Sequence, residues 1–186
     1  MTKLSLAMCL STLTLAATAS AAPFKLTSPD FKEGATLSDK SSFNSFGCSG
    51  ENVSPELDWA NAPAGTKSFA LMVRDPDAPT GSGWWHWVVY NIPADAKSLP
   101  AGAGKADNSA IPKGAVQGNT DFGTAGYGGP CPPVGSGNHH YVFTLFALKV
   151  EKLDLPATAT AAFVGFNVMA SSLGKATLTG LYGRKK

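Results

Sequence analysis

Three stretches of the chain carry apolar side chains at most positions, and each predicts a strand. They are Lys67 to Arg74, Trp85 to Ile92 and His140 to Val150. In the second and third stretches the apolar residues fall on both faces of a period-two pattern. Such strands are covered on both sides and belong in the middle of a sheet. Leu26 and the segment Leu57 to Trp59 predict shorter strands.

The segment Ala161 to Leu173 has the spacing of a helix instead. Thr158 or Thr160 is suited to cap its start, and Gly174 is suited to close its end. Three residues spaced three to four positions apart lie on one side of this helix, namely Phe163, Phe166 and Ala170. Further apolar residues lie near that side: Val164, Val168 and Leu173.

The remaining pattern predicts a mainly β (α+β) protein with few helices. Ala176 to Tyr182 predicts a last strand, and the long connection from Pro93 to Gly137 consists mostly of Gly, Pro, Ala, Asn and Asp. Connections of that length are usually functional or carry short local structure. The 20 glycines, 13 prolines and only 15% charged residues are typical of a turn-rich β protein.

The N-terminus predicts a signal peptide over residues 1–21, followed by a single domain over residues 22–186. Lys3 supplies a positive charge, and an apolar run follows from Leu4 to Ala17. Ala19 and Ala21 fit the small-x-small rule, so we expect cleavage after Ala21 or after the next alanine. No other apolar stretch approaches the length of a membrane span. We therefore expect an exported protein, periplasmic or secreted, that is not integral to the membrane.

The charge balance argues against a nucleic-acid partner. The chain has 15 basic and 13 acidic residues, and removal of Lys3 with the leader makes the mature protein nearly neutral. Binding to a phosphate backbone needs a basic surface. We expect no cofactor, and the composition is compatible with a monomer or a homodimer.

Two cysteines remain after the leader, Cys48 and Cys131. In an oxidising compartment two cysteines most often form a disulfide. We therefore predict a structural Cys48–Cys131 bond rather than a reactive thiol or a metal ligand.

Carboxylates gather in the segment Asp75-Pro76-Asp77-Ala78-Pro79. Each proline favours extended geometry in the residue before it. If the segment is extended, Asp75 and Asp77 point the same way. An ordinary proline turn with solvated carboxylates, and a cis bond before Pro79, are both open alternatives.

His86 lies within an aromatic strand that also contains Trp84, shortly after the carboxylates. If the two segments form a hairpin, Asp and His come within reach of each other. An Asp partner would favour imidazolium and raise the pKa of the histidine. A buried histidine with a purely structural role is the alternative.

His139 and Tyr141 open the third apolar stretch and share a face, whereas His140 points the other way. The preceding loop, residues 128–133, has prolines that would form a rigid wall. Its glycines would let backbone amides approach a ligand closely.

Taken together, these segments resemble the phosphatidylethanolamine-binding protein family, and more narrowly its bacterial branch named for likeness to Raf kinase inhibitor protein. The resemblance rests on DPDAP, GSGWWHWVVYNIP and GYGGPCPPVGSGNHHYVFTLFAL, in the family's order, and on ENVSPELDW near the N-terminus. It implies a large central sheet, a smaller sheet packed against it, and a few peripheral helices. It departs from the eukaryotic pattern in the pair Pro130–Cys131 and in the short segment after Tyr182.

The resemblance also implies a small pocket at one end of the sheet that takes phosphate or a phosphorylated head group. The residues that match the family's pocket are Asp75, Asp77, Trp84, His86, Gly129, Pro132, Pro133, His139 and Tyr141. We expect the carboxylates to orient and charge the histidines, and the anion to be held by imidazolium, the Tyr141 hydroxyl and backbone N–H groups. Binding should then weaken as the pH rises through the histidine pKa.

Two other functions remain open from the sequence. Asp75, Asp77, His86 and His139 could bind a divalent metal that hydrolyses phosphate esters, although no tight ligand motif such as His-Glu-x-x-His is present. A protein-interaction role, such as inhibition of a protease or modulation of a kinase pathway or a host protein, would be compatible with the same pocket.

Overall fold

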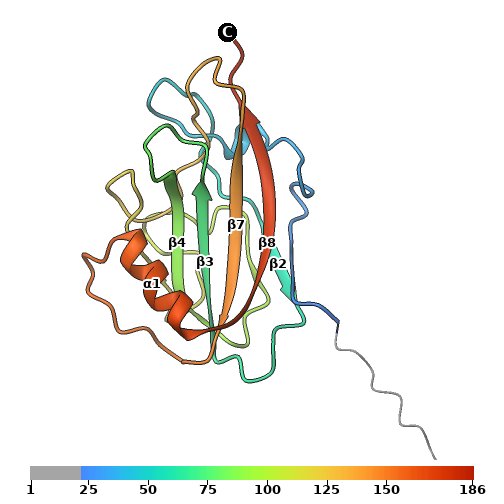
Figure 1. Cartoon of the computed structure of the whole chain (residues 1–186), viewed down its shortest axis with the longest axis vertical. Coiled ribbons are helices and arrows are strands. Elements are labelled where there is room, and N and C mark those ends of the chain that lie inside the picture. Colours follow the sequence, from blue (N-terminus) through green and yellow to red (C-terminus); the bar gives the residue numbers. More distant parts are fainter. Residues whose placement is uncertain (1–21) are drawn as a thin grey trace, which may run out of the picture.

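Strand β3 (Ser68–Asp75) lies at the centre of a five-stranded antiparallel sheet in the computed structural model, which describes residues 22–186 (Figure 1). The predicted signal peptide lies outside the described residues. The strand order is β6-β4-β3-β7-β8. The other strands of this sheet are β6 (Val116–Gln117), β4 (Trp84–Pro93), β7 (Asn138–Leu148) and β8 (Ser172–Gly183), and β3 pairs directly with β4 and β7.

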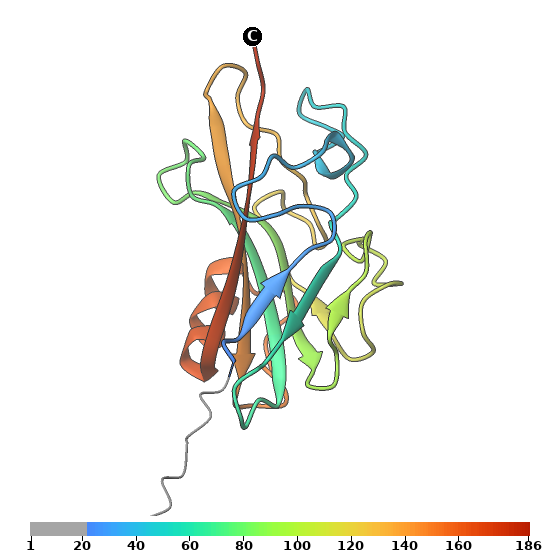
Figure 2. The ribbon, with the colours of Figure 1, turned by 90° about the vertical axis from the view of Figure 1, so that its right-hand side faces the viewer.

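A smaller three-stranded sheet packs against one face of the large sheet, and helix α1 covers the other face (Figure 2). The strands of the smaller sheet, in the order β1-β2-β5, are β1 (Lys25–Thr27), β2 (Leu57–Ala60) and β5 (Ser98–Leu99). Helix α1 spans Ala161–Ser171, and a single 3-10 turn, η1, spans Asp39–Ser41. None of the helices within residues 22–186 has the length and apolar character of a membrane span.

The alternation of side chains along β3 explains this three-layer arrangement. Leu71 and Val73 pack with Leu57 and Trp59 in the core beneath the small sheet. Met72, from the opposite face of β3, belongs to the core beneath α1. The mainly β architecture with central strands covered on both sides is therefore confirmed.

The prediction for the helix was right about its start and wrong about its end and its buried side. The Thr160 hydroxyl accepts a hydrogen bond from the Phe163 amide at 3.2 Å and caps the helix. The chain passes directly from Ser171 of α1 into β8, so the expected closing glycine lies inside a strand. Phe163 and Phe166 are 47% and 70% exposed. The sheet is contacted instead by the smaller side chains of Ala161, Val164 and Val168.

Candidate functional site

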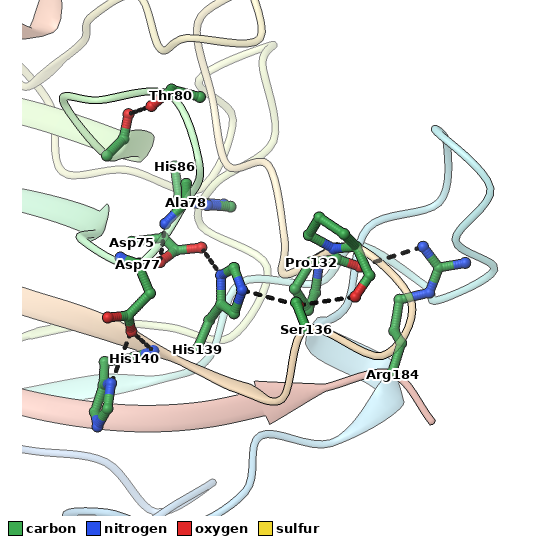
Figure 3. A network of polar contacts seen from close by, with 12 residues as sticks. Asp75, Asp77, Ala78, Thr80, His86, Pro132, Ser136, His139, His140 and Arg184 are labelled. Atoms are coloured by element: carbon green, nitrogen blue, oxygen red, sulfur yellow. Dashed lines mark hydrogen bonds and ion pairs between the residues drawn. The ribbon is translucent and has the colours of Figure 1, made fainter. Parts of the chain in front are cut away.

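A cavity of about 190 Å³ opens at the end of the large sheet where β3 ends and β4 and β7 begin. Figure 3 shows the polar contacts beside it. The antiparallel register brings these three strand ends together, because Asp75 pairs with Trp84 and Arg74 pairs with Val142. Seven of the nine predicted site residues line the cavity: Asp75, Trp84, His86, Pro132, Pro133, His139 and Tyr141.

Asp77 does not line this cavity, so the extended alternative for this segment is wrong and the alternative of a proline turn with a solvated carboxylate holds. The segment after Asp75 is a turn rather than an extended strand, because Oδ1 of Asp75 accepts the amides of Asp77 at 2.8 Å and Ala78 at 3.1 Å. Asp77 turns outward and its Oδ2 lies 2.7 Å from Nδ1 of His140 (Figure 3). The peptide bonds of residues 22–186 include no cis bond. His140 points away from the cavity, as predicted, and is exposed.

Asp75 pairs instead with His139 in the interior of the site. Nδ1 of His139 lies 2.7 Å from Oδ2 of Asp75, and the side chains are 5% and 4% exposed. Nε2 of His139 lies 3.0 Å from the Ser136 hydroxyl, which donates to the carbonyl of Pro133 at 2.8 Å. The His139 ring is therefore held at both nitrogens, by the Asp75 carboxylate and by the Ser136 hydroxyl.

His86 reaches the cavity through an irregularity in β4. The register with β3 steps from Val73–Trp87 to Arg74–Trp85 and leaves His86 without a partner. A bulge of this kind re-aims a side chain. The imidazole of His86 lies edge-on to Tyr141, with ring centroids 5.1 Å apart, on the small-sheet side of β4.

The expectation that an aspartate keeps His86 charged is wrong. Burial lowers the pKa of His86 to about 4, although the Gly128 carbonyl and the Asp75 carboxylate oppose the shift. Its Nδ1 lies 2.6 Å from the carbonyl oxygen of Gly128. A carbonyl only accepts, so Nδ1 carries the hydrogen, and near neutral pH the ring is an uncharged Nδ1–H tautomer.

Tyr141 is fully buried, and its hydroxyl has no hydrogen-bond partner among the described residues. Burial, with the neighbouring Asp75 carboxylate, raises the pKa of Tyr141 above its usual range. The hydroxyl therefore keeps its hydrogen and is available as a donor. Buried polar groups are nearly always paired, so an unpaired one on a residue that lines a cavity points to a bound partner.

The Gly-Pro wall is built differently from the expectation. Gly129 does not line the cavity, and its amide donates to Oδ1 of Asn52 at 2.8 Å. The Gly128 amide donates to the carbonyl of His86 at 2.8 Å. A Cβ atom on Gly129 would lie 2.1 Å from the carbonyl oxygen of Ser41, so a glycine is needed for close packing of two loops. The amides of Gly128 and Gly129 are therefore engaged in hydrogen bonds within the fold and are not available to a ligand.

The predicted disulfide is present. Cys48 and Cys131 are bonded across 83 residues and tie the loop after η1 to the Pro132–Pro133 wall. Arg184 lies beside this tie and donates to the carbonyls of Gly47 and Pro132 (Figure 3).

Several contributors to the site were missed from the sequence. Phe122 and Phe46 line the cavity, and Phe122 packs against both Trp84 and His86. Ser136 and Arg184 brace the site from outside. Ser136 lies three residues before His139, and that local spacing was a usable signal. Phe122 lies in the long irregular connection, where no periodicity marks it.

The four residues considered as metal ligands are not assembled into one site. Asp77 faces His140 outside the cavity, and Nδ1 of His86 is engaged by a backbone carbonyl. Within residues 22–186 no group of three or more His, Cys, Asp or Glu side chains is placed to hold a metal ion.

Comparison with known proteins gives consistent matches over this whole region. The family model described as "Phosphatidylethanolamine-binding protein" matches residues 27–183. YbcL of Escherichia coli K12 is 51% identical over 164 residues, which cover 88% of this chain and 90% of that protein. Its crystal structure superposes with a TM-score of 0.85 and covers 87% of this chain and 99% of that chain.

Two further relatives extend the comparison. YbhB of the same organism is 49% identical over 158 residues, covering 85% of this chain and 99% of that protein. The candidate lipoprotein LppC of Mycobacterium tuberculosis is 38% identical over 162 residues, covering 87% of this chain and 73% of that protein.

Proposed function

The chain belongs to the phosphatidylethanolamine-binding protein family, and on that premise we propose that its cavity binds a small phosphate-bearing ligand without catalysing a reaction. The observation that carries the proposal is the buried, unpartnered hydroxyl of Tyr141, a residue that lines the cavity. A phosphate oxygen is the acceptor that this donor lacks. The cavity of about 190 Å³ is large enough for one phosphate group.

The charges around the cavity support a ligand of low net charge. Asp75 and His139 form a buried pair, and His86 is neutral near pH 7. The residues that line this cavity include no Lys or Arg. A phosphate group therefore meets hydrogen-bonding groups rather than a cluster of free cations.

Calorimetric titration of the protein with sodium phosphate tests this proposal. We expect measurable binding, and we expect Tyr141→Phe to weaken it by roughly tenfold, the value of one hydrogen bond to a charged group. Tyr182→Phe is the matched control, because that hydroxyl donates to Asp39 away from the cavity. Absence of phosphate binding to the wild-type protein, or equal losses in both variants, would refute the proposed function.

We also propose that the protein is exported to an oxidising compartment, the bacterial periplasm. The predicted leader and the Cys48–Cys131 bond support this location, as does the relative LppC. Intact mass measurement of the protein from a bacterial periplasm should give a chain that begins at Ala22 or Pro23 without free thiols. A retained leader, or two reactive thiols after denaturation, would contradict export.

A further inference from the structure

The cavity presents hydrogen-bond acceptors as well as donors, and His86 provides the first of them. Its Nδ1 is committed to the Gly128 carbonyl at 2.6 Å. Its Nε2 makes no hydrogen bond to any residue within 22–186, and the ring lines the cavity. In a neutral ring with hydrogen on Nδ1, Nε2 carries a lone pair. His86 therefore meets a ligand as an acceptor.

The carboxylate of Asp75 is the second acceptor. It receives three hydrogen bonds, from the amides of Asp77 and Ala78 and from His139. A carboxylate can accept about four. Asp75 lines the cavity and is almost fully buried, so its charge is weakly screened there.

The prolines and glycines of the surrounding wall add no donor. Pro79, Pro132 and Pro133 line the cavity and have no amide hydrogen. The amides of Gly128 and Gly129 are already engaged within the fold. A fully deprotonated anion would therefore satisfy Tyr141 but would place its lone pairs against those of His86 and Asp75.

We propose that the cavity selects phosphate groups that still carry a P–OH hydrogen, with His86 Nε2 or the Asp75 carboxylate as the acceptor of that hydrogen. This inference rests on the proposed function and refines its ligand class. Inorganic phosphate and singly ionised phosphate monoesters meet the requirement. Phosphodiesters and sulfate do not, because neither carries an acidic hydrogen near neutral pH.

A matched set of small anions tests this selection on the wild-type protein. Titration near pH 5 should show inorganic phosphate and methyl phosphate binding with similar affinity, and dimethyl phosphate and sulfate binding roughly tenfold or more weakly, as expected for an unpaired buried acceptor. Raising the pH to about 8 should abolish the advantage of methyl phosphate, whose second ionisation lies near pH 6.

Inorganic phosphate is the internal control for the protein's own titration. It keeps at least one O–H across that pH range, so its loss of affinity should be smaller than that of methyl phosphate. The titratable groups at the cavity and beside it are Asp75 from β3, His86 from β4, His139 and Tyr141 from β7, and Asp121 from the loop before Phe122. Their titration affects both ligands alike, so the difference between the ligands reports the P–OH hydrogen.

The tautomer of His86 gives an independent measurement. Nitrogen-15 NMR of the imidazole should show hydrogen on Nδ1 and a bare Nε2 near neutral pH. Sulfate or dimethyl phosphate binding as tightly as phosphate, or a hydrogen on Nε2 of His86, would overturn the selection while leaving phosphate binding intact. Failure of every anion to bind would overturn both the selection and the proposed function.

Discussion

Nδ1 of His139 donates a hydrogen bond to Oδ2 of Asp75 across 2.7 Å, and the two residues are 64 positions apart in the chain. The pair joins the end of β3 to the beginning of β7 in the interior of the site. A second aspartate–histidine pair, Asp77 with His140, has the same separation of 2.7 Å but lies at the surface. The protein therefore carries a buried pair and a matched exposed pair a few residues apart.

This contrast predicts unequal effects of two conservative substitutions. Asp75→Asn should lower the free energy of unfolding by about 3 kcal/mol, because it removes the carboxylate from a buried pair with His139. Asp77→Asn should cost less than about 1 kcal/mol, because its pair is solvated. Urea unfolding near neutral pH measures both. Similar losses in the two variants would mean that burial does not strengthen the pair.

The neutral state of His86 predicts a loss of stability in mild acid. Its pKa is about 4 in the folded protein and ordinarily 6.5, so between these values the unfolded chain binds more protons than the folded protein. Stability should therefore be highest above pH 6.5 and should fall as the pH drops toward 4, by at most about 3 kcal/mol.

The control for this prediction removes the titrating ring. His86→Gln retains hydrogen-bonding capacity without titrating, so its stability should change much less over the same range. The lowered pKa of Asp77, caused mainly by the His140 amide, acts below its ordinary value of 3.8 and outside this window. Denaturant unfolding at several pH values measures the free energy of unfolding of both proteins. The comparison is valid where the dependence of that free energy on denaturant concentration is equal in wild type and variant. Parallel pH profiles for the two proteins would contradict a buried neutral His86.

The sequence was sufficient for the central sheet and for most of the cavity wall. Strands β3 and β4 bury side chains on both faces, whereas β7 buries one face fully and the other partly, and their apolar runs carry that information directly. The i, i+2 spacing of His139 and Tyr141 placed both on the cavity side, as the structure shows. Strands β5 and β6 have two residues each and were not predicted, because two residues are too few to show a period.

The errors share a physical cause, namely tertiary hydrogen bonds that the local pattern does not encode. Asp75 captures two following amides and turns Asp77 away from the site. The protonation state of His86 depends on its burial and on a carbonyl that comes from 42 residues further along the chain. Neither effect changes the apolar pattern of the strands.

Loss of the disulfide should weaken both the fold and the edge of the cavity. Replacing Cys48 and Cys131 by serine frees a loop of 83 residues, which costs about 4 kcal/mol on the chain-entropy model. The melting temperature should fall by about 10 °C for a domain of this size. Wild-type protein unfolded in the presence of a reductant should behave like the double variant. An unchanged melting temperature would show that Arg184 and the surrounding loops alone hold these segments together.

Helix α1 offers a direct test of which side of an apolar helix contacts the sheet. Val168 is fully buried beneath the helix, whereas Phe166 is 70% exposed although it is larger and more apolar. Val168→Ala should lower the free energy of unfolding by about 1 to 3 kcal/mol through the cavity it leaves. Phe166→Ala should change it by less than about 0.5 kcal/mol, since little buried contact is lost and alanine favours a helix. Urea unfolding of the two variants measures the difference, and a larger loss for Phe166→Ala would mean that the helix is rotated with its phenylalanines against the sheet, as the sequence pattern alone suggested.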